Sequence, residues 1–198
     1  TGDWPAFMVM ALGEDHTHGL RPGSFTPAAE VANNDQALGQ IVQGVSHSRF
    51  WKETAIFVIE DDAQNGPDHV DAHRTVGLVI SPWVKHGVAD STMYTTSSFV
   101  KTMELILGLP PMTQFDTAAT PMYAAFTATP SLDPIDSLPP QTELTSRNPA
   151  TGAGAVASLK LDFSDYDRAD PDELNRILWD AMKPGQPMPA PVRSARLH

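Results

Sequence analysis

Apolar residues along this chain follow two different spacings. Three short runs are apolar at nearly every position, which predicts buried strands at 5–12, 54–60 and 75–81. Elsewhere apolar residues recur every three or four positions, which predicts helices over 27–46, from Ser97 or Ser98 to Leu107, and over 116–126. The order strand, helix, strand, strand, helix is typical of an α/β fold.

The composition and the apolar spacing of the chain change after residue 126. Residues 127–165 are rich in Pro, Ser and Thr and keep no sustained period, which predicts an irregular, extended segment. Residues 168–183 recover helical spacing, with acids near the start and Lys183 near the end as the helix dipole favours. We therefore expect a main domain over 1–126, an extended segment over 127–165, and a C-terminal helix and tail over 166–198.

Composition narrows the class of protein. The chain has 198 residues, of which 41% are hydrophobic and 19% charged, as in a folded globular domain. Its formal net charge of −11 argues against a nucleic acid or an anionic membrane as partner. It has no cysteine, which excludes thiolate metal sites and Cys nucleophiles. No apolar run reaches the length of a membrane span.

Acids and histidines gather where two of the predicted strands end. The run at 5–12 leads into Glu14-Asp15-His16-Thr17-His18, and the run at 54–60 leads into Asp61-Asp62, with His69 and His73 in the following loop. In an α/β sheet, ligands bind beyond the carboxyl ends of the strands. Singly, each of these residues is explained by a solvated loop or a turn hydrogen bond. As a cluster they favour a functional site.

The residue types point to a metal ion. Carboxylates and imidazoles together are ligands for Zn²⁺, Mn²⁺ or Fe. Two adjacent aspartates repel each other unless a positive charge lies between them, and a metal ion supplies that charge. His47 and His86 have no acidic residues near them in the sequence, so we place both outside this site.

Several motifs, in order, resemble one known family. "TAIFVIEDDAQNGPDHV" followed by "LVISPWVKHG", with "DHTHG", "NNDQALGQIV" and "SRFWKETAIF" around them, resembles the phosphoesterase family of bacterial phospholipases C and acid phosphatases. That family belongs to the alkaline phosphatase superfamily. The likeness covers roughly residues 5–126 and is greatest for secreted members fused to YVTN β-propeller repeats. "YDRADPDELNRILWDAM" resembles their C-terminal end.

The resemblance implies an alkaline-phosphatase-like α/β/α sandwich and metal-dependent hydrolysis of phosphate esters. It assigns metal ligation to Asp61 and Asp62, to His73, and to the acid-x-x-x-His pair Glu14 and His18. His16 is the alternative in that loop, as a residue lining the phosphate pocket. The resemblance leaves the divalent metal open among Zn, Mn, Fe and Ca, and it implies a secreted or periplasmic protein.

One departure from the family limits what this chain supplies. The family draws an acidic or amide metal ligand and a Ser or Thr nucleophile from its N-terminal half, and no residue here matches that nucleophile motif. Thr17 and Ser81 lie near the cluster in sequence but not at the required strand-to-helix turn. The resemblance therefore implies the C-terminal portion of a larger enzyme, with the nucleophile upstream and little activity in this chain alone.

Three functional hypotheses follow. The first is a phosphatase or phospholipase C whose missing N-terminal half and phosphate-ester substrate are its partners. The second is a non-catalytic or degenerate binding or structural domain of a secreted β-propeller protein. The third is a mutase or sulfatase activity, since fold likeness does not decide the substrate. A sheet that lacks half of its strands is also expected to form a homodimer through its uncovered apolar face.

Overall fold

The computed structural model describes residues 3–13, 17–60, 75–165 and 168–189. Their contacts divide them into two compact units. The first unit contains described residues 3–10, 42–60 and 76–136. The second contains residue 75 and the described residues of 11–41 and 137–189. In this described part, no helix is long and apolar enough to cross a bilayer.

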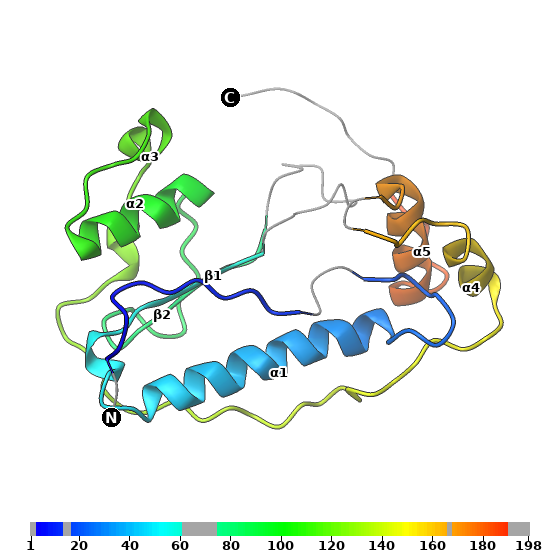
Figure 1. The fold of residues 1–198 in the computed structure, drawn as a ribbon, viewed down its shortest axis with the longest axis horizontal. Helices are drawn as coiled ribbons and strands as arrows, with labels where there is room; N and C mark the ends of the chain where they lie inside the picture. Colours follow the sequence, from blue (N-terminus) through cyan, green and yellow to red (C-terminus); the bar gives the residue numbers. More distant parts are fainter. Residues whose placement is uncertain (1–2, 14–16, 61–74, 166–167, 190–198) are drawn as a thin grey trace. The chain divides into compact units, whose positions relative to one another are not determined.

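The first unit is built around a small antiparallel sheet. Strands β1 (Ile56–Ile59) and β2 (Gly77–Ile80) pair in a register that runs from Ile56 opposite Ile80 to Ile59 opposite Gly77. The strands predicted at 54–60 and 75–81 are therefore confirmed, each two residues shorter at its start and one residue shorter at its end. With the helices around it, this sheet agrees with a general α/β class (Figure 1).

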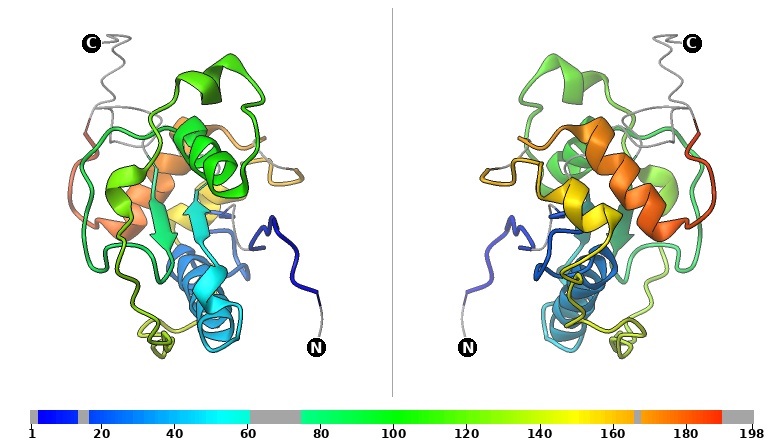
Figure 2. Two further views of the ribbon diagram at one scale, coloured as in Figure 1. Left: turned by 90° about the vertical axis from the view of Figure 1, so that its left-hand side faces the viewer. Right: turned by 90° about the vertical axis from the view of Figure 1, so that its right-hand side faces the viewer.

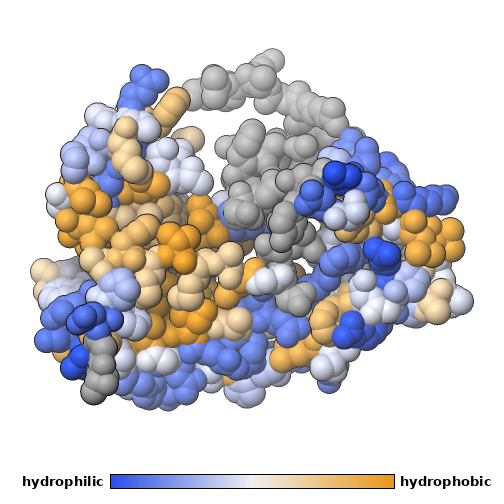
Figure 3. All heavy atoms as spheres, in the orientation of Figure 1, coloured by the Kyte–Doolittle hydropathy of each residue, from blue (hydrophilic) through white to orange (hydrophobic). Residues whose placement is uncertain are grey.

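The strand predicted at 5–12 was wrong. The described residues 3–13 contain no strand, and their apolar side chains are largely open to solvent, with Phe7 55%, Val9 80% and Met10 63% exposed. An apolar run favours a strand only where another strand supplies hydrogen bonds and a covering face, and among the described residues no strand pairs with this segment. Figure 3 shows apolar side chains gathered over this part of the first unit.

Helix α2 (Thr96–Leu107) covers one face of the sheet. Its N-cap is Thr95 rather than the predicted Ser97 or Ser98, because Thr95 and Ser98 form a capping box. It ends at Gly108, whose φ of 67° is left-handed. The Phe99 ring packs edge-on against Phe57 of β1, with 6.0 Å between ring centroids.

Three short helices complete the first unit. The 3-10 helix η1 (Trp51–Glu53) precedes β1 and buries Trp51. The helix predicted over 116–126 is split into α3 (Gln114–Ala118) and the 3-10 turn η2 (Tyr123–Ala125). The interruption falls at Pro121, because a proline disfavours helical backbone in the residue before it.

The long helix α1 (Pro27–Ser46) confirms the prediction over 27–46. Its first turns belong to the second unit, and its residues from Val42 belong to the first. Thr26 precedes it, and its hydroxyl accepts a hydrogen bond from the Ala29 N–H at 3.2 Å and so caps the helix. Ala29 is fully buried.

Two further helices pack together in the second unit (Figure 2). Helix α5 (Pro171–Met182) confirms the C-terminal helix and starts at Asp170, whose carboxylate accepts from the Glu173 N–H at 2.9 Å. Leu174 and Ile177 of α5 are each 4% exposed and form part of the core. Helix α4 (Ala153–Ser158) lies inside the segment predicted to be irregular. It is too short to show a period, and its packing against α5 stabilises it.

Candidate functional site

His18 is the predicted ligand whose surroundings the structure describes. The other predicted site residues, Glu14, His16, Asp61, Asp62 and His73, lie outside the described residues. The site can therefore be built from the loop that carries His18 and from the segments of the second unit that contact this loop.

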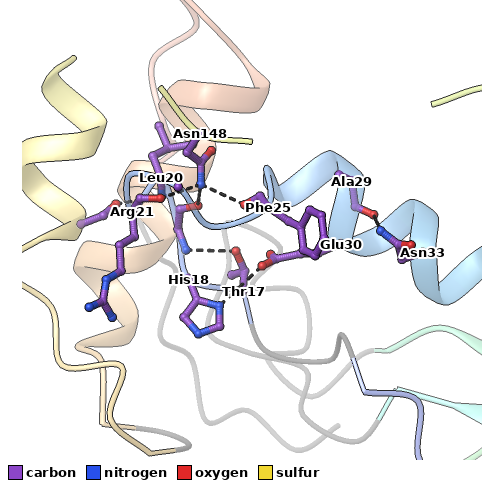
Figure 4. Close-up of polar contacts among 12 residues, drawn as sticks. Thr17, His18, Leu20, Arg21, Phe25, Ala29, Glu30, Asn33 and Asn148 are labelled. Carbon is purple, nitrogen blue, oxygen red and sulfur yellow. Dashed lines mark hydrogen bonds and ion pairs between the residues drawn. The ribbon is translucent and has the colours of Figure 1, made fainter. Parts of the chain in front are cut away.

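A buried carboxylate lies against the His18 ring. The His18 Nδ1 atom is 3.6 Å from Oε1 of Glu30, in the first turn of α1. The two side chains differ in exposure, with 46% for His18 and 6% for Glu30. Figure 4 shows the two pointing toward each other. The distance is longer than that of a hydrogen bond, and it places the carboxylate beside the Nδ1 side of the ring.

The backbone around His18 has a conformation that requires glycine next to it. Gly19 has a φ of 57°, and a Cβ at this position would lie 2.9 Å from Oγ of Ser158 and 3.3 Å from Cδ1 of Leu174. Thr17 accepts a hydrogen bond from the Gly19 N–H at 3.0 Å, and the Leu20 N–H donates to Ser158 Oγ at 2.8 Å. The His18 ring also contacts Phe163, with 5.6 Å between centroids. Local sterics and contacts with α4 and α5 thus hold this loop.

Asn148 holds the rest of the loop. Its side-chain amide donates to the carbonyls of Gly19 at 3.1 Å, Arg21 at 3.2 Å and Phe25 at 2.9 Å. Its backbone N–H donates to the Ser24 carbonyl at 2.9 Å, and Asn148 is 4% exposed (Figure 4). The buried Asn148 amide keeps its hydrogen bonds only if these carbonyls stay where they are. The segment after His18 therefore has a defined path.

Sequence reasoning missed both Glu30 and Asn148. Glu30 reads as an acid that suits the start of a helix dipole, and Asn148 reads as one polar residue in an irregular segment. Their roles depend on contacts 12 and 130 residues away from His18 along the chain, for which no local pattern exists.

The remaining candidates have structural explanations in the first unit. His47 lies 2.8 Å from the carboxylate of Asp136, an acid far from it in the sequence. His86 contacts the Ser81 carbonyl at 3.2 Å. The Ser81 hydroxyl is buried and donates to the Thr54 carbonyl at 2.9 Å, so it is occupied by the fold.

The described residues do not by themselves form a metal site. Among them, no group of three or more His, Asp or Glu side chains converges as a ligand set. The chemistry that His18 can perform is nevertheless defined. With Nδ1 beside a carboxylate, the imidazole can present the lone pair of Nε2 to a cation.

Comparison with protein-family models and with curated protein sequences finds no match to this chain.

Proposed function

We propose that this chain supplies metal ligands to a phosphate-ester hydrolase of the phosphatase or phospholipase C type, with an alkaline-phosphatase-like sandwich in the complete protein. The ligands in this proposal are Asp61, Asp62, His73, Glu14 and His18, with His16 at the phosphate. The single observation that carries the proposal is the contact between His18 and the buried carboxylate of Glu30.

That contact supports the proposal because metal-bound histidines commonly have a carboxylate at their other ring nitrogen. Such a carboxylate fixes the ring's orientation and increases its basicity as a ligand. Glu30 is positioned for this role because it projects from a long helix whose first turns are fixed by Thr26 and by the buried Ala29. His18 itself is about half exposed, so its free nitrogen is accessible to an ion.

In the proposed hydrolysis, these residues would hold a divalent cation and balance its charge. A bound divalent ion would lower the pKa of an attacking hydroxyl and neutralise charge on the phosphate oxygens. The hydroxyl would come from outside residues 1–198, while the residues of this chain hold the cation. Carboxylates balance its charge, and the neutral imidazoles complete its coordination.

Metal content tests the proposal directly. We expect the wild-type chain to retain a divalent metal after dialysis, measured by mass spectrometry, and the Asp61→Ala/Asp62→Ala variant to lose it. His18→Ala should weaken binding, and Glu30→Gln should weaken it by about tenfold to a hundredfold, as loss of an outer-sphere partner does. His47→Ala is the matched control, because its side chain has the same 46% exposure as His18 and also contacts a carboxylate.

The outcomes separate the hypotheses. Loss of metal in the Asp61/Asp62 and His18 variants, with His47→Ala unchanged, supports the phosphoesterase proposal. Equal retention of metal by all variants would contradict it and would favour the non-catalytic binding domain.

A further inference from the structure

Two buried carboxyl groups meet between α2 and α3 in the first unit. Glu104, near the C-terminal end of α2, is 5% exposed, and Asp116 of α3 is 3% exposed. Their side chains are within hydrogen-bond reach of each other. Burying two negative charges side by side is strongly unfavourable, so the pair needs a proton or a neighbouring cation.

Asp116 is the member of the pair that keeps its negative charge. Its carboxylate accepts from the Met112 N–H at 2.6 Å, from the Thr113 N–H at 2.7 Å and from the Thr113 hydroxyl. The Thr113 hydroxyl contributes most to holding the pKa of Asp116 well below its usual range, while burial acts in the opposite direction. The bond from the Thr113 N–H is also one half of the capping box at the start of α3, and in the other half the Thr113 hydroxyl oxygen accepts from the Asp116 N–H.

Glu104 is the member that takes up the proton. Both of its side-chain oxygens are buried, and no N–H or O–H group of the described residues makes a regular hydrogen bond to either of them. Burial raises the pKa of Glu104 above its usual value, and Asp116 raises it further through their hydrogen bond and its negative charge. The Met112 N–H and the Lys101 ammonium act in the opposite direction. Glu104 also lies in the last turn of α2, where the helix dipole disfavours a negative charge.

We propose that Glu104 and Asp116 share one proton and form a pH-sensitive latch that holds residues 109–118 against α2. In the closed latch, the Glu104 carboxyl donates its proton to Asp116, and Asp116 in turn holds the turn at Met112 and Thr113. The same contact determines the path of the chain after Gly108. The N–H groups of Gly108 and Leu109 both donate to the Glu104 carbonyl.

The direction of the pH effect follows from linkage. Asp116 has a lowered pKa, so its contribution to stability is present above the ordinary range of an aspartate and is lost as the pH falls through the folded-state value. Glu104 has a raised pKa, so its proton is lost as the pH rises through the folded-state value, and the latch weakens above it. The latch is thus most stable in mildly acidic solution. Opening frees a segment that carries the exposed Met112 and Phe115.

Hydrogen exchange tests the latch on the whole chain. The reporters are the N–H groups of Thr117 and Ala119, which bond to the carbonyls of Thr113 and Asp116. Above the raised pKa of Glu104 we expect their protection factors, corrected for intrinsic exchange, to fall by up to about tenfold per pH unit, since closing binds one proton. The Leu174 and Lys183 N–H groups of α5 should show no such fall.

A matched pair of variants isolates Glu104. In Glu104→Gln the side chain is neutral and always has N–H donors, so protection of α3 should become independent of pH. Glu143→Gln replaces an exposed glutamate and should behave like the wild type. If Glu104→Gln fails to fold, the carboxyl ¹³C titration of Glu104 in the wild type decides. A pKa at or below the ordinary glutamate value, or equal pH dependence in both variants, would overturn the latch.

Discussion

At the scale of the residue, a few buried polar side chains fix the path of the loops around them. Asn148 connects three carbonyls of the loop that carries His18, at distances between 2.9 and 3.2 Å. The Gly19 carbonyl belongs to a buried residue, so the loss of the Asn148 donor leaves it without compensation, whereas the Arg21 carbonyl also accepts from the Ser24 N–H at 3.2 Å. The orientation of His18 therefore depends on a residue that performs no chemistry itself.

Asn148→Ala should destabilise the chain by about 2 kcal/mol, the usual penalty for leaving buried acceptors without donors. Urea denaturation measures this change, and Gln141→Ala, at an exposed position in the same irregular segment, is the control. A loss in Asn148→Ala no larger than that of Gln141→Ala would show that the loop does not depend on the amide.

At the scale of the element, the contact between α2 and the sheet depends on close approach. Gly77 at the start of β2 lies so near Phe99 that a Cβ would be 2.9 Å from the ring's Cζ atom. The ring is 8% exposed and also packs against Phe57, so it has little room to shift. A glycine inside this short strand thus permits the helix to cover the sheet.

Gly77→Ala should therefore destabilise the chain by about 1–3 kcal/mol through overpacking, as measured by thermal denaturation. Gly44→Ala is the matched control, since no atom lies within 4 Å of its added methyl group and its position in α1 is helical. That control should stabilise the chain by about 0.5–1 kcal/mol.

A second substitution tests whether the loss of stability in Gly77→Ala is steric. Phe99→Leu replaces the ring that the new methyl group meets with a shorter side chain. The loss of stability caused by Gly77→Ala should therefore be smaller in a Phe99→Leu background. Equal losses in both backgrounds would contradict the steric explanation.

At the scale of the whole molecule, the proposed function requires a nucleophile in addition to the metal ligands of this chain. Among the hydroxyls considered as nucleophiles, that of Thr17 accepts from Gly19 and that of Ser81 is buried in a hydrogen bond to Thr54. Neither lies at a strand-to-helix turn. If the residues of this chain act only as metal ligands, hydrolysis needs a nucleophile from elsewhere.

The isolated chain should accordingly hydrolyse p-nitrophenyl phosphate at no more than a background rate, with Zn²⁺, Mn²⁺ or Ca²⁺ added in turn. An intact alkaline phosphatase in the same assay serves as the positive control. An initial rate comparable with that enzyme, abolished in Asp61→Ala/Asp62→Ala, would show that the chain contains its own nucleophile.

Much of the local structure was determined by the sequence alone. The positions of α1, α5 and the two strands follow from apolar spacing and from end signals such as Thr26-Pro27 and Asp170-Pro171. These signals act over a few residues, because capping and amphipathic burial are decided within one or two turns. The cluster of acids and histidines is likewise visible in the sequence, and its metal-binding role remains a prediction.

Tertiary structure alone decided which distant groups meet. It left residues 5–10 without a strand partner, paired β1 with β2 in antiparallel register, and stabilised α4 against α5. It also brought Glu30 to His18, Asn148 to the loop after His18, and Glu104 to Asp116. The physical reason is that hydrogen bonds, buried charges and strand pairing depend on distance in space, and a linear pattern specifies that distance only for near neighbours.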